Sequence, residues 1–341
     1  MRILAIGATG FIGPYAVREL TELGHHVAVV HRGDTEASLP NGVRRILCDH
    51  DGLSNLRREL ERFAPDIVLD VIPYTERQAR DLVRTFRGLA GRVVVLSSAD
   101  VYRNYDGLRG RPSASPDPVP LKEGSPLRET LYPYRGHDIP FAYRDDYEKI
   151  LVERTVLNQA DLPGTVLRLP AVYGPGDKQH RLRPYLRRMD DGRPAILLGD
   201  KQARWRWTRG YVGNVAAAIA VAVTDARATA RTYNVGEDPT RTEREWIQEI
   251  GKVVGWRGDV VTLDDKELPA HLKQPYDWRY DLATDTRRIR EELGYREPVP
   301  EQEAIEATLQ WERSHVDEAD RPDYAAEDAA LANSRGAGDA V

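Results

Sequence analysis

The sequence has almost no cysteine and no long hydrophobic run. Cys48 is the single cysteine among 341 residues, so an intrachain disulfide and a cysteine-rich metal site are both excluded. Every apolar run is far shorter than the about 20 residues that a membrane-spanning helix needs. The net charge of −5 gives no electrostatic reason to expect nucleic acid or an anionic membrane as partner. Because no secretion signal pattern precedes the first strand pattern, we expect a soluble cytoplasmic protein.

Hydrolase patterns are also missing. The eight histidines show no zinc-ligand spacing with a second donor on one helix face. No serine stands in a nucleophile-elbow pattern. A metal-dependent or serine hydrolase is therefore disfavoured, and no metal site is predicted.

Short apolar runs rich in β-branched residues alternate along the chain with segments of helical periodicity. The expected strands lie at 3–6, 26–30, 43–47, 67–72, 93–97 and 165–169. The expected helices lie at 15–23, 53–63, 75–89 and 145–159. This alternation predicts an α/β fold in which helices cover both faces of a parallel sheet.

A glycine turn, Gly7-Ala-Thr-Gly-Phe-Ile-Gly13, follows the first expected strand. Glycine permits backbone angles closed to other residues and lets main-chain N–H groups approach a ligand. The next helix begins with unpaired N–H groups and a positive dipole end, which suit a pyrophosphate. Because a strand precedes the turn and a helix and a second strand follow it, this βαβ unit predicts a dinucleotide site.

The end of the second strand indicates which dinucleotide binds. An NAD site usually has Asp or Glu about 20 residues beyond the glycines, where the carboxylate accepts hydrogen bonds from a ribose. Here the strand ends in His31-Arg32-Gly33, and the first acid is Asp34. The guanidinium of Arg32 can pair with a 2′-phosphate, so we predict NADP(H) over NAD(H). In the alternative, Arg32 is a solvated cation and Asp34 binds the ribose.

Two hydroxyls and a carboxylate follow the expected strand at 93–97, in Ser97-Ser98-Ala99-Asp100. Ligands of open α/β sheets bind outside the carboxyl ends of the strands. Ser98 can hydrogen-bond a carbonyl or hydroxyl during hydride transfer, and Asp100 can carry a proton. In the alternative, the serines only satisfy the strand terminus. Residues 102–140 form a long irregular stretch, which favours a substrate loop or lid over a mobile surface excursion.

The sequence resembles the extended short-chain dehydrogenase/reductase superfamily, in its NAD(P)-dependent epimerase/dehydratase branch. The glycine turn is joined in this resemblance by the motifs at 97–102, 167–176, 209–216 and 233–236. The resemblance implies a Rossmann-type doubly wound parallel sheet, a smaller C-terminal substrate domain and a homodimer. The implied domains are an NADP-binding domain at 1–172, to which 211–236 returns, and a substrate domain at 173–210 and 237–315. Residues 316–341, acidic and rich in Ala and Gly, are expected to be a disordered tail.

The predicted cofactor contacts come from the glycine turn, from the strand ends and from a lysine of the next helix. They are Gly7, Thr9, Gly10, Phe11, Ile12, Gly13, Arg32, Ser97, Lys149, Pro170 and Val172. Enzymes of this type place a catalytic tyrosine four residues before that lysine, so that both share a helix face. Here Asp145 stands at that position. Tyr143 and Tyr147, six and two residues before Lys149, share its face on no regular helix.

Three hypotheses address this departure. In the first, Tyr143 reaches the substrate from a distorted first turn and acts with Ser98, Asp100 and Lys149. In the second, another group carries the proton, from the set Asp100, Asp145, Tyr102, Tyr132 and Tyr134. In the third, the chain has lost redox chemistry and kept the nucleotide site. For Lys149 the alternative role is an ion pair with Asp145 or Glu153 on a surface helix.

The stretch 178–210 is rich in arginine and lysine. Within it, residues 202–209 alternate arginine and tryptophan as a strand would, with Trp205 and Trp207 opposite Arg204 and Arg206. The resemblance implies that an arginine here binds the diphosphate of a nucleotide-sugar, a task that suits its paired donors. We predict Arg204 and Arg206 as substrate ligands; the alternative is that these cations are solvated.

We therefore predict an NADP(H)-dependent oxidoreductase, epimerase or dehydratase acting at a carbinol or carbonyl. The substrate is a nucleotide-sugar or a similar small anionic metabolite. The alternative is a non-redox protein that senses NADP(H), or binds RNA or a partner protein, because the usual tyrosine is missing and tryptophans alternate with arginines. The acidic net charge disfavours nucleic acid as the partner.

Replacing Arg32 by alanine tests the cofactor prediction. We expect R32A to bind NADPH about 10- to 100-fold more weakly, because it loses charge-assisted hydrogen bonds to the 2′-phosphate. Its affinity for NADH is expected to stay unchanged. Both affinities are measured by energy transfer from tryptophan to the reduced nicotinamide. Equal affinity of the unaltered protein for NADH and NADPH would contradict the prediction.

Overall fold

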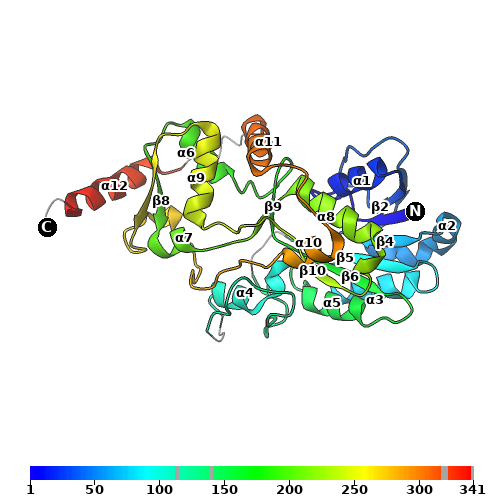
Figure 1. Cartoon of the computed structure of the whole chain (residues 1–341). Coiled ribbons are helices and arrows are strands. Elements are labelled where there is room, and N and C mark those ends of the chain that lie inside the picture. Colours follow the sequence, from blue (N-terminus) through cyan, green and yellow to red (C-terminus); the bar gives the residue numbers. More distant parts are fainter. Residues whose placement is uncertain (112–114, 138–140, 316–321, 339–341) are drawn as a thin grey trace.

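A seven-stranded parallel sheet forms the centre of the first lobe (Figure 1). The computed structural model describes residues 1–111, 115–137, 141–315 and 322–338. In spatial order the strands are β3 (Arg44–Leu47), β2 (His26–His31), β1 (Arg2–Ile6), β4 (Ile67–Asp70), β5 (Arg92–Ser98), β6 (Gly164–Leu169) and β10 (Thr232–Asn234). The chain reverses its direction of winding between β1 and β4, so a ligand crevice is expected outside their carboxyl ends. The predicted α/β fold of Rossmann type is confirmed.

Each strand of this sheet contributes side chains to two hydrophobic cores, one on each face, because successive side chains point to opposite faces. Ile3 and Ala5 pack in the core beneath α1 (Gly13–Glu22) and α8 (Val212–Thr224). Leu4 and Ile6 pack in the other core, beneath α2 (Arg57–Phe63), α3 (Glu76–Phe86) and α5 (Lys149–Leu157). The near-continuous apolar runs of the sequence are therefore strands buried on both faces.

The second lobe is built on a pair of parallel strands, β8 (Ala195–Gly199) and β11 (Asp259–Leu263). Three helices, α6 (Arg183–Asp190), α7 (Asp200–Arg204) and α9 (Glu243–Val254), gather around it (Figure 1). A short parallel pair, β7 (Ala171–Tyr173) and β9 (Arg209–Tyr211), lies between the lobes. The remaining helices are α4 (Arg103–Leu108), α10 (Arg287–Leu293) and α11 (Glu301–Ser314). Within the described residues, no helix combines the length and apolarity needed to cross a membrane.

The structure corrects the expected start of the helix at 145–159. Residues 142–146 form turns, Glu148 is extended, and α5 begins only at Lys149. The Glu148 carboxylate accepts a hydrogen bond from the Ile150 N–H, which caps the helix at this point. The prediction that Tyr147 and Lys149 lie on different faces assumed that one regular helix contains both residues. Because the helix begins at Lys149, that prediction does not apply.

Two further segments differ from the sequence-based expectations. Residues 202–208 form no named strand: they end α7 and continue through isolated bridges at Arg206 and Trp207, and β9 begins only at Arg209. The expected disordered tail contains helix α12 (Tyr324–Gly338), while residues 316–321 and 339–341 lie outside the described residues. Alanine favours the helix, and Glu327 is buried there against Arg188 and His271.

A buried ion pair joins the sheet to α5. Arg168 on β6 donates two hydrogen bonds to Glu153, at 3.0 and 2.7 Å, and both side chains are nearly inaccessible. Ser97 donates to the same carboxylate at 2.6 Å. Removing one partner of such a pair leaves an uncompensated charge in the interior.

This pair predicts the outcome of replacing Glu153 by alanine. We expect E153A to lower the free energy of unfolding by about 3–5 kcal/mol, because Arg168 is left buried without its partner. Glu61, whose pair with Arg57 is about half exposed on both sides, is the matched control, and E61A is expected to cost less than about 1 kcal/mol. Urea denaturation measures both values, and equal costs would contradict the prediction.

Candidate active site

The glycine turn is shaped so that two of its glycines cannot carry a side chain. Gly7 has a φ of 70°, and a Cβ there would lie 2.2 Å from Ile72 Cγ1. A Cβ at Gly13 would lie 2.4 Å from the main chain of Ala8. At Gly10, by contrast, a Cβ would meet no described atom within 4 Å. No described side chain caps α1, so its first N–H groups and the open side at Gly10 fit a pyrophosphate.

The end of β2 holds a residue that the sequence analysis did not use. His31 is 8 % exposed, and neither ring nitrogen has a hydrogen-bond partner among the described residues. Burial and the nearby Arg45 charge lower the pKa of His31, so the ring is neutral at pH 7 and can donate one hydrogen bond and accept another. In NAD sites an acid stands at this strand end. The position of His31 at the end of the strand could therefore have identified it from the sequence as a candidate ribose contact.

Arg32 and Asp34, the two alternatives for the adenosine ribose, lie side by side. Arg32 Nε is 3.3 Å from Asp34 and 3.9 Å from Asp49, and the Arg32 side chain is 52 % exposed. The guanidinium is therefore accessible at the end of β2, where a 2′-phosphate would approach. The orphaned nitrogens of His31 and the accessible Arg32 both fit a dinucleotide.

The carboxyl end of β5 separates the roles of the two serines. Ser97 is buried and donates to Glu153, as described above, whereas Ser98 lines a large cavity. The Ser98 hydroxyl accepts a hydrogen bond from the Asp100 N–H at 3.2 Å. Successive strand residues point in opposite directions, so Ser98 is the serine that can reach a ligand in the cavity.

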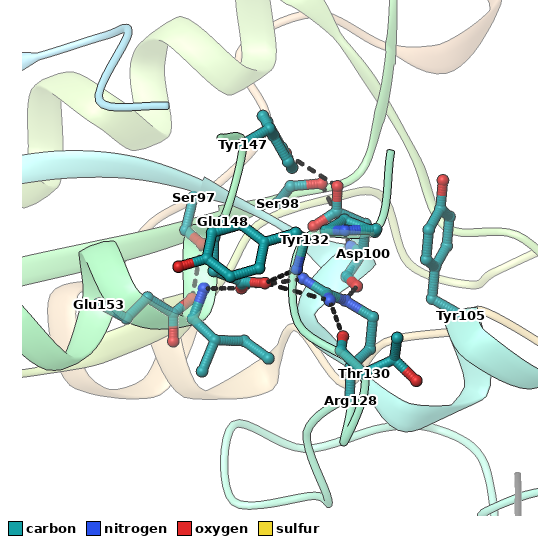
Figure 2. A network of polar contacts seen from close by, with 12 residues as sticks. Ser97, Ser98, Asp100, Tyr105, Arg128, Thr130, Tyr132, Tyr147, Glu148 and Glu153 are labelled. Atoms are coloured by element: carbon teal, nitrogen blue, oxygen red, sulfur yellow. Dashed lines mark hydrogen bonds and ion pairs between the residues drawn. The ribbon is translucent and has the colours of Figure 1, made fainter. Parts of the chain in front are cut away.

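Asp100 lies at the centre of a group of tyrosines (Figure 2). Tyr147 donates to Asp100 Oδ2 at 2.8 Å. Tyr134 donates to the same oxygen at 3.2 Å. The hydroxyls of Tyr134 and Tyr105 are 2.9 Å apart. All four side chains line the cavity. The described part of the 102–140 stretch thus supplies Tyr105 and Tyr134 to this wall, while residues 112–114 and 138–140 lie outside the described residues.

A second buried ion pair holds this group in place. Arg128 and Glu148 have fully buried side chains, with Arg128 Nη2 3.1 Å from Glu148 Oε1. Arg128 Nε also donates to the Asp100 carbonyl, and Nη1 donates to the Thr130 carbonyl (Figure 2). The Glu148 carboxylate accepts from the Tyr132 N–H at 2.6 Å. The strand end, the irregular stretch and the start of α5 are thereby tied to one another.

Lys149 points inward and not along a surface. Its Nζ donates to the carbonyls of Pro73 and Leu96 at 3.0 and 2.8 Å, and it lies 4.9 Å from the centre of the Tyr74 ring. Of the two acids considered as surface partners, Glu153 instead binds Arg168, and Asp145 accepts from the Gly136 N–H. Lys149 is thus placed beneath the cofactor crevice.

Tyr143 is not among the described residues that line the cavity, whereas Tyr147 is. The Tyr143 ring packs against Tyr74 and Phe141, with centroids 5.6 and 6.0 Å away. Charges of Asp49, Asp51, Arg32 and Arg77 act on its hydroxyl, which places it toward the end of β2. The structure therefore brings Ser98, Asp100 and Lys149 together without Tyr143.

The cavity has a volume of about 1300 Å³ and extends from the carboxyl end of β5 into the second lobe. Its aromatic wall consists of Trp205, Trp207, Tyr276 and Trp278, whose successive ring centroids are 5.0–5.4 Å apart. Five cations also line it: Arg109 near the end of α4, and Lys178, Arg181, Arg187 and Arg188 in the second-lobe part. Pro170 of the predicted cofactor contacts lies on its rim, and Val172 is buried in β7.

Arg204 and Arg206 are both exposed and are not among the described residues that line this cavity. Arg204 pairs with Asp200 within α7, and Arg206 lines a separate hollow of about 390 Å³ with Arg241 and Asp285. The tryptophans and arginines thus lie on opposite sides, as the alternation predicted, but it is the tryptophan side that lines the cavity.

Comparisons with known proteins agree with this geometry. Residues 3–236 match the model of the NAD dependent epimerase/dehydratase family. The chain is 29% identical over 302 residues to 2′-dehydrokanamycin reductase of Streptomyces kanamyceticus, covering 83% of this chain and 77% of that protein. It is 24% identical to dTDP-4-dehydro-6-deoxy-D-allose reductase of a Streptomyces species, over 92% of this chain and 96% of the relative.

A solved structure with the same fold is the UDP-glucose 4-epimerase of Thermus thermophilus in complex with NAD. Its TM-score is 0.63 at 23% identity, covering 93% of this chain and 100% of that one. The family match spans well over half of the sequence. The chain belongs to the NAD dependent epimerase/dehydratase family and is an NAD(P)-dependent enzyme of the extended short-chain dehydrogenase/reductase type.

Proposed function

We propose that this protein is an NADP(H)-dependent oxidoreductase, epimerase or dehydratase that acts at a carbinol or carbonyl of a nucleotide-sugar or a similar anionic metabolite. The observation that carries the proposal is the cavity wall at the end of β5, where Ser98 and the Asp100 group face one large space. The two curated relatives are named as reductases of dehydro sugars, which favours reduction of a carbonyl.

The preference for NADP(H) is proposed from the end of β2. Arg32 is accessible there and can exchange its contact with Asp34 for a 2′-phosphate. His31 can hydrogen-bond the ribose with its unpartnered ring nitrogens. The N–H groups at the start of α1 hold the pyrophosphate. When bound, the cofactor supplies or removes a hydride.

The substrate is proposed to be anionic because four cations line the second-lobe part of the cavity. Arg181 already pairs with Asp177 at 2.7 Å, and Arg188 pairs with Glu327. Lys178 is exposed, so it can contact a phosphate without giving up a buried partner. We therefore propose Lys178, in place of Arg204 and Arg206, as a ligand of the anionic group. The aromatic wall suits stacking on a sugar or a base.

The alternative of a non-redox sensor or RNA-binding protein loses its main support. The arginines that alternate with tryptophan in the sequence do not share a face with them, because Trp205 and Trp207 line the cavity and Arg204 and Arg206 do not. A homodimer and a place in the cytoplasm stay predictions from the sequence.

Lys149 is proposed to hold the nicotinamide ribose. It is completely buried, and the loss of solvation lowers its pKa from 10.5 to about 8, against the opposing charges of Asp100, Asp70 and Glu153. At pH 7 the ammonium is therefore charged at the expense of stability. Such a residue is expected where ligand binding needs the charge.

Because Lys149 is buried, its titration makes the free energy of unfolding depend on pH. Between about pH 8 and 10.5 the unfolded chain binds the Lys149 proton and the folded chain does not, so raising the pH favours the folded state. Between pH 7 and pH 10.5, we expect the free energy of unfolding of the wild type to rise by about 3 kcal/mol relative to that of K149M. Urea denaturation at both values measures it, with exposed Lys252→Met as control. An unchanged difference would contradict the assignment.

A panel of sugar substrates tests the proposed activity. Nucleotide-sugars and keto-sugars are offered with NADPH or NADH, and products are resolved by NMR. We expect turnover of at least one member, faster with NADPH, and a loss of about 100-fold or more in kcat for S98A, whose hydroxyl orients the reacting oxygen. Stoichiometric NADPH use would identify a reductase, whereas conversion without net use would identify an epimerase or dehydratase. No turnover with any member would contradict the proposal.

A further inference from the structure

We propose that Tyr147 and Asp100 act together as the acid–base pair of this enzyme, so that Tyr147 replaces the tyrosine missing at position 145. The inference rests on the proposed function and names the groups that move its proton. Asp100 was predicted as a proton carrier from its place after β5, but the role of Tyr147 does not follow from the sequence, because this tyrosine stands two and not four residues before Lys149.

The backbone before α5 explains how Tyr147 reaches this place. Glu148 is extended, with φ −158° and ψ 92°, and its N–H donates to the Tyr74 carbonyl at 2.9 Å. Its buried carboxylate is fixed by Arg128. Tyr147 therefore enters the cavity wall from an extended segment, and its ring centre lies 5.8 Å from Lys149 Nζ.

The hydrogen bonds around Asp100 leave one carboxylate oxygen available. Oδ2 accepts from both Tyr147 and Tyr134, and since Tyr134 donates there, its own oxygen accepts from Tyr105. Oδ1 is buried and has no partner among the described residues, although Asp100 lines the cavity. A buried acceptor without a partner is costly, so Oδ1 has an unused acceptor site in a residue that lines the cavity.

The pair solves a problem that a single tyrosine would have. Burial, and next the Asp100 charge, raise the pKa of Tyr147 well above its usual value, so a free phenolate is strongly disfavoured. A tyrosine that passes its proton to Asp100 as it receives one never carries that charge. The carboxylate 2.8 Å away is positioned for this transfer.

In the oxidative direction, the substrate carbinol would lose its O–H proton to Tyr147 Oη, and the dinucleotide, when bound, would accept the C–H hydride. The Tyr147 O–H bond breaks at the same time, and its proton forms a bond to Asp100. The carbinol becomes a carbonyl, and Asp100 becomes a neutral acid. In the reductive direction each bond change is reversed: Asp100 returns the proton to Tyr147, which protonates the carbonyl oxygen.

Tyr143 is the competing assignment, and tyrosine-to-phenylalanine variants separate the two. With a substrate that the wild type turns over, we expect Y147F to lower kcat by about 10²- to 10⁴-fold, with the affinity for NADPH within about twofold. Y143F is expected to keep most of the turnover. D100N retains an acceptor for Tyr147 but cannot take its proton, so it is expected to lose turnover as Y147F does.

The matched control is Tyr233→Phe. Tyr233 also donates to a carboxylate at 2.8 Å, that of Glu292, and it is not among the described residues that line the cavity. Y233F should lose a comparable hydrogen bond and keep its turnover. Turnover of Y147F within threefold of the wild type, or a loss confined to Y143F, would overturn the inference.

A second readout does not need turnover. In protein labelled with ¹³Cζ-tyrosine, the resonance that disappears in Y147F is expected to shift in D100N, whereas the one that disappears in Y143F is expected to stay. A Tyr147 resonance unaffected by D100N would overturn the pair. Absence of wild-type turnover on every substrate would instead overturn the proposed function, so the two failures are distinguishable.

Discussion

The site depends on the buried ion pair between Arg128 and Glu148. Buried pairs add little net stability, because desolvation of both charges offsets their attraction, but they tolerate few arrangements. This pair ends the extended segment before α5 and binds the carbonyl of Asp100. The positions of Asp100, Tyr147 and Lys149 therefore follow from one interaction between side chains twenty residues apart in the sequence. The irregular stretch that carries Arg128 is thus a structural part of the site.

The division of work at the end of β5 has an equally simple origin. Strand alternation turns Ser97 toward Glu153 and Ser98 toward the cavity. Glu153 and Lys149 share a face of α5, so the same helix supplies an acid to the interior and an ammonium to the cofactor crevice. Neighbouring residues of one strand and one helix consequently separate a stabilising ion pair from the reactive groups.

Local patterns in the sequence predicted the sheet, the glycine turn and the places of Ser98 and Asp100, because these depend on periodicity and on strand ends. Lys149 was singled out by the resemblance to the family and not by periodicity. The role of Tyr147 could not be predicted, because it depends on where α5 begins. That start is fixed by Glu148, whose carboxylate pairs with Arg128, a residue distant in the sequence. The alternation placed Arg204 and Arg206 opposite the tryptophans, but it could not show that the tryptophan side lines the cavity. Helix α12 was missed because composition indicated disorder, whereas the burial of Glu327 against Arg188 is a tertiary effect.

The central claim is that the cavity wall at β5 and the glycine turn serve one bound dinucleotide. A crystal structure of the protein with NADP⁺ tests this most directly. We predict the pyrophosphate at the start of α1, the 2′-phosphate at Arg32, and the nicotinamide between Ser98 and Tyr147, with Lys149 on its ribose. A nicotinamide that lies against Tyr143, or that leaves the Tyr147 hydroxyl out of reach of a substrate on its ring, would contradict the account.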